Sequence, residues 1–289
     1  MRRTLALAIA ALLVLTACGP GASPGPATGA PGGTQAAPPS FAADSTMGAI
    51  QAKGKLTCGV KFDVIAFGFR NPTTSEVEGF DADLCREIAA ALGVQPEFVE
   101  AISANRIPFL LEDRVDVVIS TMTRTAARLE EIDFSKIYYL AGQKILVKSD
   151  STYQSIDDLV SAAVKVCSAQ GSTSEANLRT EGVAEANLVL FGTYSEAATA
   201  LLDGRCEAVS TDDSILFGLA EQNEGTEVRG DTFSSEPLGI GIKKGKDDLV
   251  QFINGVLDAM AADGRWAALY DKHIKPYTGE DAPEPPLDM

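Results

Sequence analysis

Short apolar runs of strand length alternate with helical segments along most of this chain. We expect strands at 56–60, 96–101, 115–120, 164–168, 187–191, 206–210 and 239–242, with a new section opening at 143–147. The expected helices lie at 80–92, 105–112, 125–131, 174–180, 195–202, 214–222, 248–262 and 265–272. Because strands that alternate with helices are typical of βα units, the pattern predicts an α/β fold with parallel, doubly wound sheets.

The alternating strands and helices form two groups along the chain, and a last segment follows them. This pattern predicts two α/β lobes, with the last segment returning to the first lobe. We expect lobe 1 at 48–146, lobe 2 at 147–236, the second segment of lobe 1 at 237–275, and an extended tail at 276–289. The helix at 80–92 has the clearest internal signals, with Asp81 as its expected N-terminal cap and Gly93 as its stop.

The amino terminus has the pattern of a bacterial lipoprotein signal. A basic MRR start precedes an apolar run at 5–15, which is too short to span a bilayer, and the run ends in Leu-Thr-Ala-Cys at Cys18. We expect residues 1–18 to direct export and Cys18 to carry lipid; an ordinary signal peptide containing a cysteine is the alternative. Residues 19–47, rich in Pro, Gly, Ala, Ser and Thr, predict a flexible tether.

Composition restricts the partners and the chemistry. The net charge of −16 argues against nucleic acid and anionic membrane surfaces as partners. With no CxxC spacing and a single histidine, we expect neither a metal site nor a cofactor, and no nucleophile–base pair of a hydrolase.

Beyond Cys18, four cysteines remain, and in an exported protein they predict two disulfides. Three pairings are possible. We favour Cys58–Cys85 with Cys167–Cys206, because each pair then lies within one half of the chain.

Polar side chains follow the expected strands at their carboxyl ends, where open α/β sheets bind ligands. They are Lys61, Ser103, Arg106, Thr121, Thr123, Arg128, Ser172, Thr173 and Asp212. Cations and hydroxyls for carboxylates, with an aspartate for an ammonium group, suit a single α-amino acid.

Several segments together resemble the polar amino-acid solute-binding proteins of ABC importers. They are LTCGV, GFDADLCREIAAALG, STMTRTAAR with EIDFS, QGSTSE, GRCEAVSTDDSI and LGIGIKKG, and the resemblance covers residues 55–275 in order. NRIPFL, QGSTSE, the Asp212–Asp213 pair and the Pro-rich tail are most similar to the glutamate/aspartate-binding members. The resemblance implies a type II periplasmic-binding-protein fold, in which two lobes joined by a hinge close on one amino acid.

The resemblance also implies roles for single residues. Arg128 would hold the ligand α-carboxylate, with Thr123 and the backbone of Thr121 beside it, and Asp212 would bind the α-ammonium group. Ser172 and Thr173 would close from the second lobe. Lys61 and Arg106 match positions whose arginines reach the side-chain carboxylate of acidic ligands, although Lys61 supplies a point charge where the family pattern has a fork. Phe67 or Phe62 would cover the aliphatic part of the ligand. The four cysteine positions recur in some members, which supports the favoured pairing.

We therefore expect a monomeric, lipid-anchored receptor that captures glutamate or aspartate and delivers it to a membrane permease. The same role for glutamine, asparagine or a broad set of polar amino acids is the alternative. A dehydratase on the same scaffold and a sensory module are further hypotheses from other classes.

Overall fold

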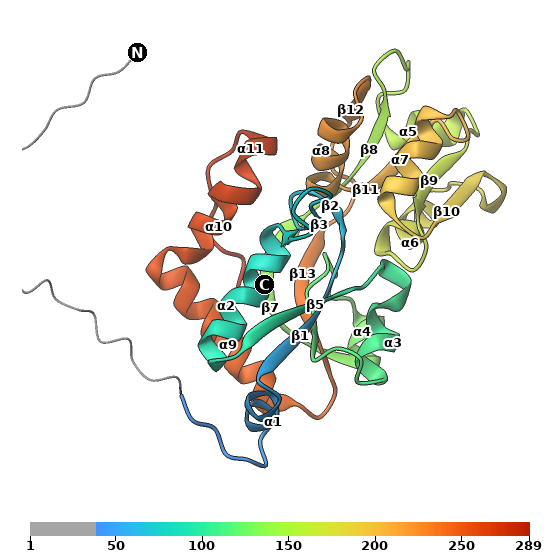
Figure 1. The fold of residues 1–289 in the computed structure, drawn as a ribbon. Coiled ribbons are helices and arrows are strands. Elements are labelled where there is room, and N and C mark those ends of the chain that lie inside the picture. Colours follow the sequence, from blue (N-terminus) through green and yellow to red (C-terminus); the bar gives the residue numbers. More distant parts are fainter. Residues whose placement is uncertain (1–38) are drawn as a thin grey trace, which may run out of the picture. The chain divides into compact units, whose positions relative to one another are not determined.

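The computed structural model describes residues 39–289, in which two five-stranded sheets form the cores of two lobes (Figure 1). The predicted signal peptide, Cys18 and most of the predicted tether lie outside the described residues. Within residues 39–289, no helix is both long enough and apolar enough to cross a bilayer.

The first sheet has the order β5 (Gln95–Glu100), β1 (Lys55–Val60), β6 (Val117–Val118), β13 (Glu236–Lys243) and β7 (Ile132–Ala141). One face packs against α2 (Phe80–Leu92), α9 (Asp247–Asp263) and α10 (Arg265–His273), and the other against α3 (Arg106–Leu111). The helices α1 (Thr46–Lys53) and α4 (Ala126–Glu131) complete this lobe. A small sheet of β2 (Asp63–Val64), β3 (Gly68–Arg70) and β4 (Val77–Glu78) follows β1.

The second sheet has the order β10 (Leu188–Phe191), β9 (Val166–Ala169), β11 (Ala208–Asp212), β8 (Gln143–Lys148) and β12 (Thr226–Arg229). Alternate residues of β8 face opposite sides: Ile145 and Val147 pack with α5 (Ile156–Ser161) and α6 (Thr173–Thr180), and Leu146 packs with α7 (Tyr194–Leu202) and α8 (Asp213–Gln222). Apolar side chains on both faces of a strand require helices on both sides of the sheet.

The chain crosses between the lobes twice. It leaves the first sheet after β7, passes Gly142 and enters β8, and it returns through residues 230–235 into β13. The two crossings lie side by side, because Glu236 at the start of β13 pairs with Ala141 at the end of β7. The lobe boundary expected after residue 146 therefore falls inside β8, and the strand β8 belongs to the second sheet.

The sheets are mixed, which corrects the expectation of purely parallel sheets. β13 is antiparallel to both β6 and β7, and β8 is antiparallel to both β11 and β12. These antiparallel strands are the ones that carry the chain between lobes. A strand that enters from the other sheet is not preceded by a crossover helix within its own sheet, so the rule that makes βαβ units parallel does not apply to it.

Three local expectations are also corrected. Asp81 does not cap α2: the cap position is Gly79, with φ 120°, and Asp81 is fully buried in the first turn. The end of the predicted tether packs on the lobe, because Phe41 lies edge-on against Phe252 and Thr46 begins α1. The predicted extended tail opens with a turn of helix, α11 (Lys275–Thr278).

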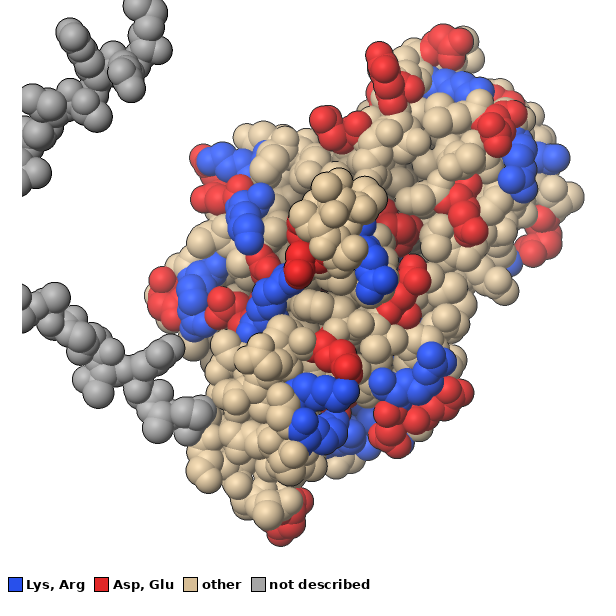
Figure 2. Space-filling view, viewed as in Figure 1, with Lys and Arg blue, Asp and Glu red and all other residues tan. Residues whose placement is uncertain are grey.

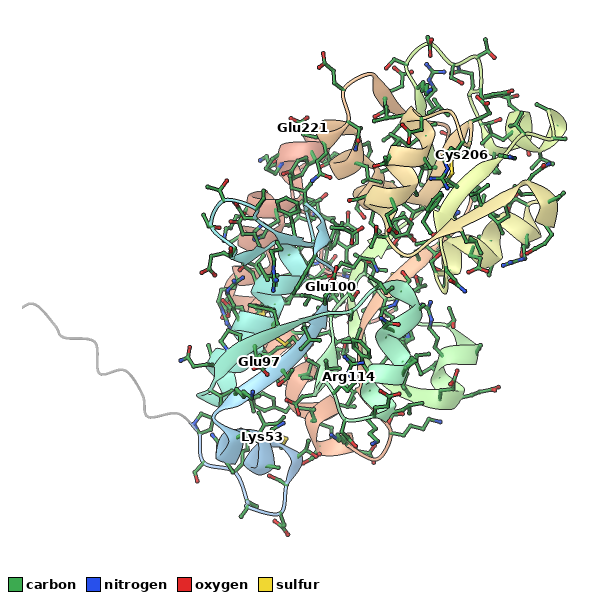
Figure 3. The ribbon with its side chains drawn as sticks, turned by 45° about the vertical axis from the view of Figure 1, so that its right-hand side comes forward. Lys53, Glu97, Glu100, Arg114, Cys206 and Glu221 are labelled. Atoms are coloured by element: carbon green, nitrogen blue, oxygen red, sulfur yellow. A yellow bond between two sulfur atoms is a disulfide. The ribbon has the colours of Figure 1, made fainter. Side chains whose placement is uncertain are left out.

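Both predicted disulfides are confirmed. Cys58–Cys85 joins β1 to α2, and Cys167–Cys206 joins β9 to the residues before β11, where Figure 3 labels Cys206. Each bridge thus connects an inner strand of a sheet to a neighbouring segment of the same lobe.

We expect each disulfide to stabilise its lobe, and the bridge that closes the longer loop to stabilise slightly more. The loops span 27 and 39 residues, which corresponds to about 3.5 and about 3.9 kcal/mol in the chain-entropy account. Paired Cys58→Ala/Cys85→Ala and Cys167→Ala/Cys206→Ala variants should lose unfolding free energy of this order in urea titrations. An unchanged midpoint for either pair would contradict this.

Candidate binding site

Arg106 lies at the centre of the site, and its guanidinium is bound by backbone carbonyls. Nε donates to the carbonyl of Ser103 (3.2 Å), Nη1 to those of Ser120 and Thr121 (both 3.0 Å), and Nη2 to that of Gly171 (3.5 Å). Its side chain is buried, with 2% of the residue exposed. The first three carbonyls belong to loops after β5 and β6, so Arg106 ties together two strand ends of the first lobe and touches the second.

Lys61 follows β1 and lies against the same loops. Its Nζ donates to Ser103 Oγ (3.1 Å) and to the carbonyl of Ser120 (3.5 Å), and it lies 5.8 Å from the centre of the Tyr194 ring. The residue is 3% exposed. Burial, together with the charge of Arg106, lowers the pKa of Lys61 to about 7, against the opposing effect of nearby aspartates.

Thr121 has a strained backbone and an unpaired hydroxyl. Its φ of 41° lies in the left-handed region, which a β-branched residue adopts rarely. The Thr121 N–H donates to Asp81 Oδ2 (2.8 Å), and Tyr138 donates to Asp81 Oδ1 (2.8 Å). Burial raises the pKa of Asp81 to about 6, against these hydrogen bonds. Thr121 Oγ1 is buried and has no hydrogen-bond partner among the described residues.

Arg128 extends from α4 toward the same region. Thr125 caps this helix by accepting from the Arg128 N–H. The guanidinium donates to the carbonyl of Thr123 (2.7 Å) and to that of Gly171 (3.4 Å). Burial lowers the pKa of Arg128, and the carboxylates of Glu236 and Asp212 oppose the shift.

The second lobe contributes Asp212, Ser172 and Thr173. Asp212 ends β11 and is 3% exposed. Burial raises its pKa well above the usual range, and Glu236 and Asp213 raise it further, whereas Lys61 and Arg106 lower it. Ser172 caps α6 by accepting from the Glu175 N–H (3.1 Å) and donates to the carbonyl of Ala169 (2.7 Å). Its hydroxyl is therefore committed to the fold of its own loop.

The two lobes are in contact across the site. Thr123 and Thr173 hydroxyls lie 3.1 Å apart, and Asp63 Oδ2 accepts from the Tyr194 N–H (2.9 Å) at the start of α7. Gly171, with φ 75°, lies so close to Ala104 that a Cβ would be 2.8 Å from its Cα. Glycine at this position therefore permits the closed arrangement.

Nine of the ten predicted ligand residues lie at this contact between the lobes, and Phe67 does not share their contacts. The Phe67 side chain is fully buried in an aromatic cluster, edge-on to Tyr139 with ring centres 5.2 Å apart. Phe62, the alternative, is partly buried, and the Arg70 guanidinium lies 4.2 Å from its ring centre.

Two residues of the site, Glu236 and Tyr194, were not predicted from the sequence. Glu236 is 3% exposed and accepts from Thr123 Oγ1 (2.6 Å), Asn177 Nδ2 (2.6 Å) and Ser234 Oγ (2.7 Å). Tyr194 is buried beside Lys61. Glu236 begins a strand, β13, and does not follow one, and Tyr194 resembles an ordinary residue in the first turn of a helix. The strand-end rule therefore gave no signal for either.

The site brings side chains of both charges together between the lobes. Three buried or half-buried cations (Lys61, Arg106 and Arg128) lie among the carboxylates of Asp81, Asp212 and Glu236. Within residues 39–289, no group of three or more His, Cys, Asp or Glu side chains is placed to hold a metal ion. Such a set of opposite charges, with an orphan hydroxyl, can recognise the two charged groups of a zwitterion.

Residues 56–276 match the family model of the bacterial extracellular solute-binding proteins, family 3. The chain belongs to this family. Members of this family are exported. The family match and the similarity to solved structures of amino-acid-binding proteins confirm the predicted two-lobed α/β fold.

Two curated proteins and one solved structure illustrate what this solute-binding protein is similar to. The ABC transporter glutamine-binding protein GlnH of Bacillus subtilis (strain 168) is 38% identical over 95% of this chain and 98% of its own length. The glutamate-binding protein GluB of Corynebacterium efficiens is 31% identical over 83% of each chain. The crystal structure of AncCDT-1, an ancestral amino acid-binding protein and precursor of cyclohexadienyl dehydratase, superposes with a TM-score of 0.74 at 35% identity, over 80% of this chain and 100% of that one.

The low pKa of Lys61 predicts a pH-dependent stability. Below pH 7 the buried ammonium is charged in both folded and unfolded states, and its burial costs free energy. Between pH 7 and 10.5 the folded protein binds fewer protons than the unfolded chain, so the unfolding free energy rises with pH. Lys61→Met should therefore be more stable than the wild type at pH 6, with a smaller advantage at pH 9, in urea titrations.

The exposed lysine variant Lys244→Met controls for the loss of one positive charge. An advantage of Lys61→Met that grows from pH 6 to pH 9 would contradict the assignment.

Proposed function

We propose that this protein is the lipid-anchored, extracytoplasmic binding component of an ABC importer, and that glutamine is its preferred ligand. In this account Arg128 binds the α-carboxylate and Asp212 the α-ammonium group. The lobes close on the amino acid and present it to the permease. The glutamine proposal takes the place of the acidic ligand expected from the sequence.

The hydrogen bonds of the Arg106 guanidinium are the main evidence for a neutral ligand side chain. A free guanidinium fork is the strongest side-chain partner for the second carboxylate of an acidic ligand. All three nitrogens of the Arg106 guanidinium already donate to backbone carbonyls. Arg106 therefore supports the shape of the loops, and its remaining capacity for a ligand carboxylate is small.

The charge balance supports the same choice. Lys61, with a pKa of about 7, presents less than a full positive charge at neutral pH. Three acidic side chains, Asp81, Asp212 and Glu236, are already buried beside the three cations of the site. A zwitterion with a neutral amide side chain keeps this balance, whereas glutamate or aspartate would add one buried negative charge.

The relatives point in the same direction. The relative named as glutamine-binding is more similar to this chain than the relative named as glutamate-binding, and it is matched over nearly its whole length. The basic start, the apolar run and Cys18 support lipid attachment, and the tether would let a monomer reach a permease in the same membrane.

Calorimetry with glutamine, glutamate, aspartate, asparagine and arginine tests the proposal. We expect glutamine to bind at least about tenfold more tightly than glutamate, a difference of about 1.4 kcal/mol. Tighter binding of glutamate or aspartate would overturn the choice of glutamine, and dissociation constants above the millimolar range for all five would overturn the amino-acid function.

Arg128→Ala should abolish measurable binding of every amino acid. Arg124→Ala is the matched control, since Arg124 lies four residues away and donates instead to the carbonyl of Met289 (2.6 Å).

A further inference from the structure

We propose that Glu236 is a positioning residue that holds the two lobes in the closed, ligand-binding arrangement. This inference rests on the proposed function only where glutamine affinity is measured. The contact between the lobes does not depend on which ligand the protein binds. Glu236 is the first residue of β13, the strand by which the chain returns to the first lobe.

The carboxylate of Glu236 bonds to both lobes at once. Oε2 accepts from Thr123 Oγ1 (2.6 Å) in the first lobe, and Oε1 accepts from Asn177 Nδ2 (2.6 Å) on α6 of the second. Ser234 Oγ donates to Oε1 as well (2.7 Å). Hydrogen bonds to a buried ionised group are among the stronger contacts in proteins, so this residue links the lobes more firmly than a surface pair would.

Glu236 also determines the direction of the hydroxyl contact between the lobes. The Thr123 hydroxyl has one proton, and Glu236 accepts it, so Thr173 is the donor in the 3.1 Å contact between the two hydroxyls. Thr123 therefore acts as an acceptor from the second lobe. A ligand carboxylate beside it is then bound by Arg128 rather than by the Thr123 hydroxyl.

A buried network continues from Glu236 into the second sheet. Asn177 Nδ2 also donates to Gln143 Oε1 (2.9 Å), and Gln143 Nε2 donates to Ser210 Oγ (2.8 Å). Gln143 is the first residue of β8, directly after the other crossing at Gly142. Both crossings therefore contribute to one network, and an opening of the lobes that separates Thr123 from Asn177 must break at least one of its bonds.

Amide exchange at α7 reports closure directly. The Tyr194 and Ser195 N–H groups begin this helix, and they donate across the lobes to Asp63 Oδ2 (2.9 and 3.3 Å). These bonds exist only while the lobes are together. Hydrogen exchange of the two amides in ligand-free protein should therefore become faster when closure weakens.

The test compares Glu236→Gln with the wild type. Glutamine has one carboxamide oxygen and no charge, so at one of the two positions an NH2 group faces either the donor Asn177 Nδ2 or Thr123 Oγ1, and the charge-assisted bond there is lost. We expect exchange at Tyr194 and Ser195 to accelerate roughly tenfold, and glutamine affinity to fall by a similar factor. The ratio of glutamine to asparagine affinity should stay unchanged, because Glu236 acts on closure and not on the ligand side chain.

Three further variants make the result decisive. Asn177→Ala should have the same effect, and the double variant should add little to either single one. In Gly171→Ala the added Cβ would lie 2.8 Å from the Ala104 Cα, so we expect this variant to disfavour the closed contact and to give a reference for weakened closure. The exposed Glu207→Gln controls for the loss of a charge.

Unchanged exchange in both Glu236→Gln and Asn177→Ala, with thermal melts showing folded protein, would overturn the assignment. A changed affinity ratio would also overturn it, by placing Glu236 against the ligand side chain. If the wild type bound no amino acid, the proposed function would fail, and the exchange of the ligand-free protein would still decide the role of Glu236.

Discussion

The bonds of the buried Arg106 guanidinium to backbone carbonyls are the contact on which the site depends. Carbonyls after the strands β5 and β6 would repel one another where the strand ends converge, and the guanidinium satisfies them together. The loops so arranged place Lys61 beside Ser103 and leave Thr121 in its strained conformation, with its N–H on Asp81. A cation that serves the fold in this way is a poor candidate for the main contact of an acidic ligand.

The charges of the site are concentrated between the lobes, whereas on the face drawn in Figure 2 acidic and basic side chains are interspersed. Ion pairs among exposed groups, such as Lys55 with Glu97, contribute little. The buried groups differ, because burial shifts the pKa values of Lys61, Asp81 and Asp212 toward their neutral forms. Charged groups of a bound zwitterion would oppose these shifts, so ligand binding would stabilise the ionised forms that burial between the lobes disfavours.

Much of this could be predicted from the sequence, and the failures have physical reasons. The strand-end rule brought together Arg106, Thr123 and Asp212, because parallel strands end on one edge of each sheet. The rule concerns only residues that follow a strand, so it does not predict Glu236, which begins one. Asp81 has the spacing of a helix cap, yet it is buried, because Tyr138 and the Thr121 N–H offer it partners that lie far away in sequence. Likewise β7 was not expected: its apolar residues follow a short helix directly, without the turn signal that marks the other strands.

We propose that the lobes close on an α-amino acid with a neutral polar side chain. Mass spectrometry of the small molecules released on denaturing the purified, folded protein tests it most directly. We expect glutamine at close to one molecule per chain in the wild type, and its loss from Arg128→Ala. Recovery of glutamate, or of a compound without an α-amino acid group, at the same occupancy would contradict it.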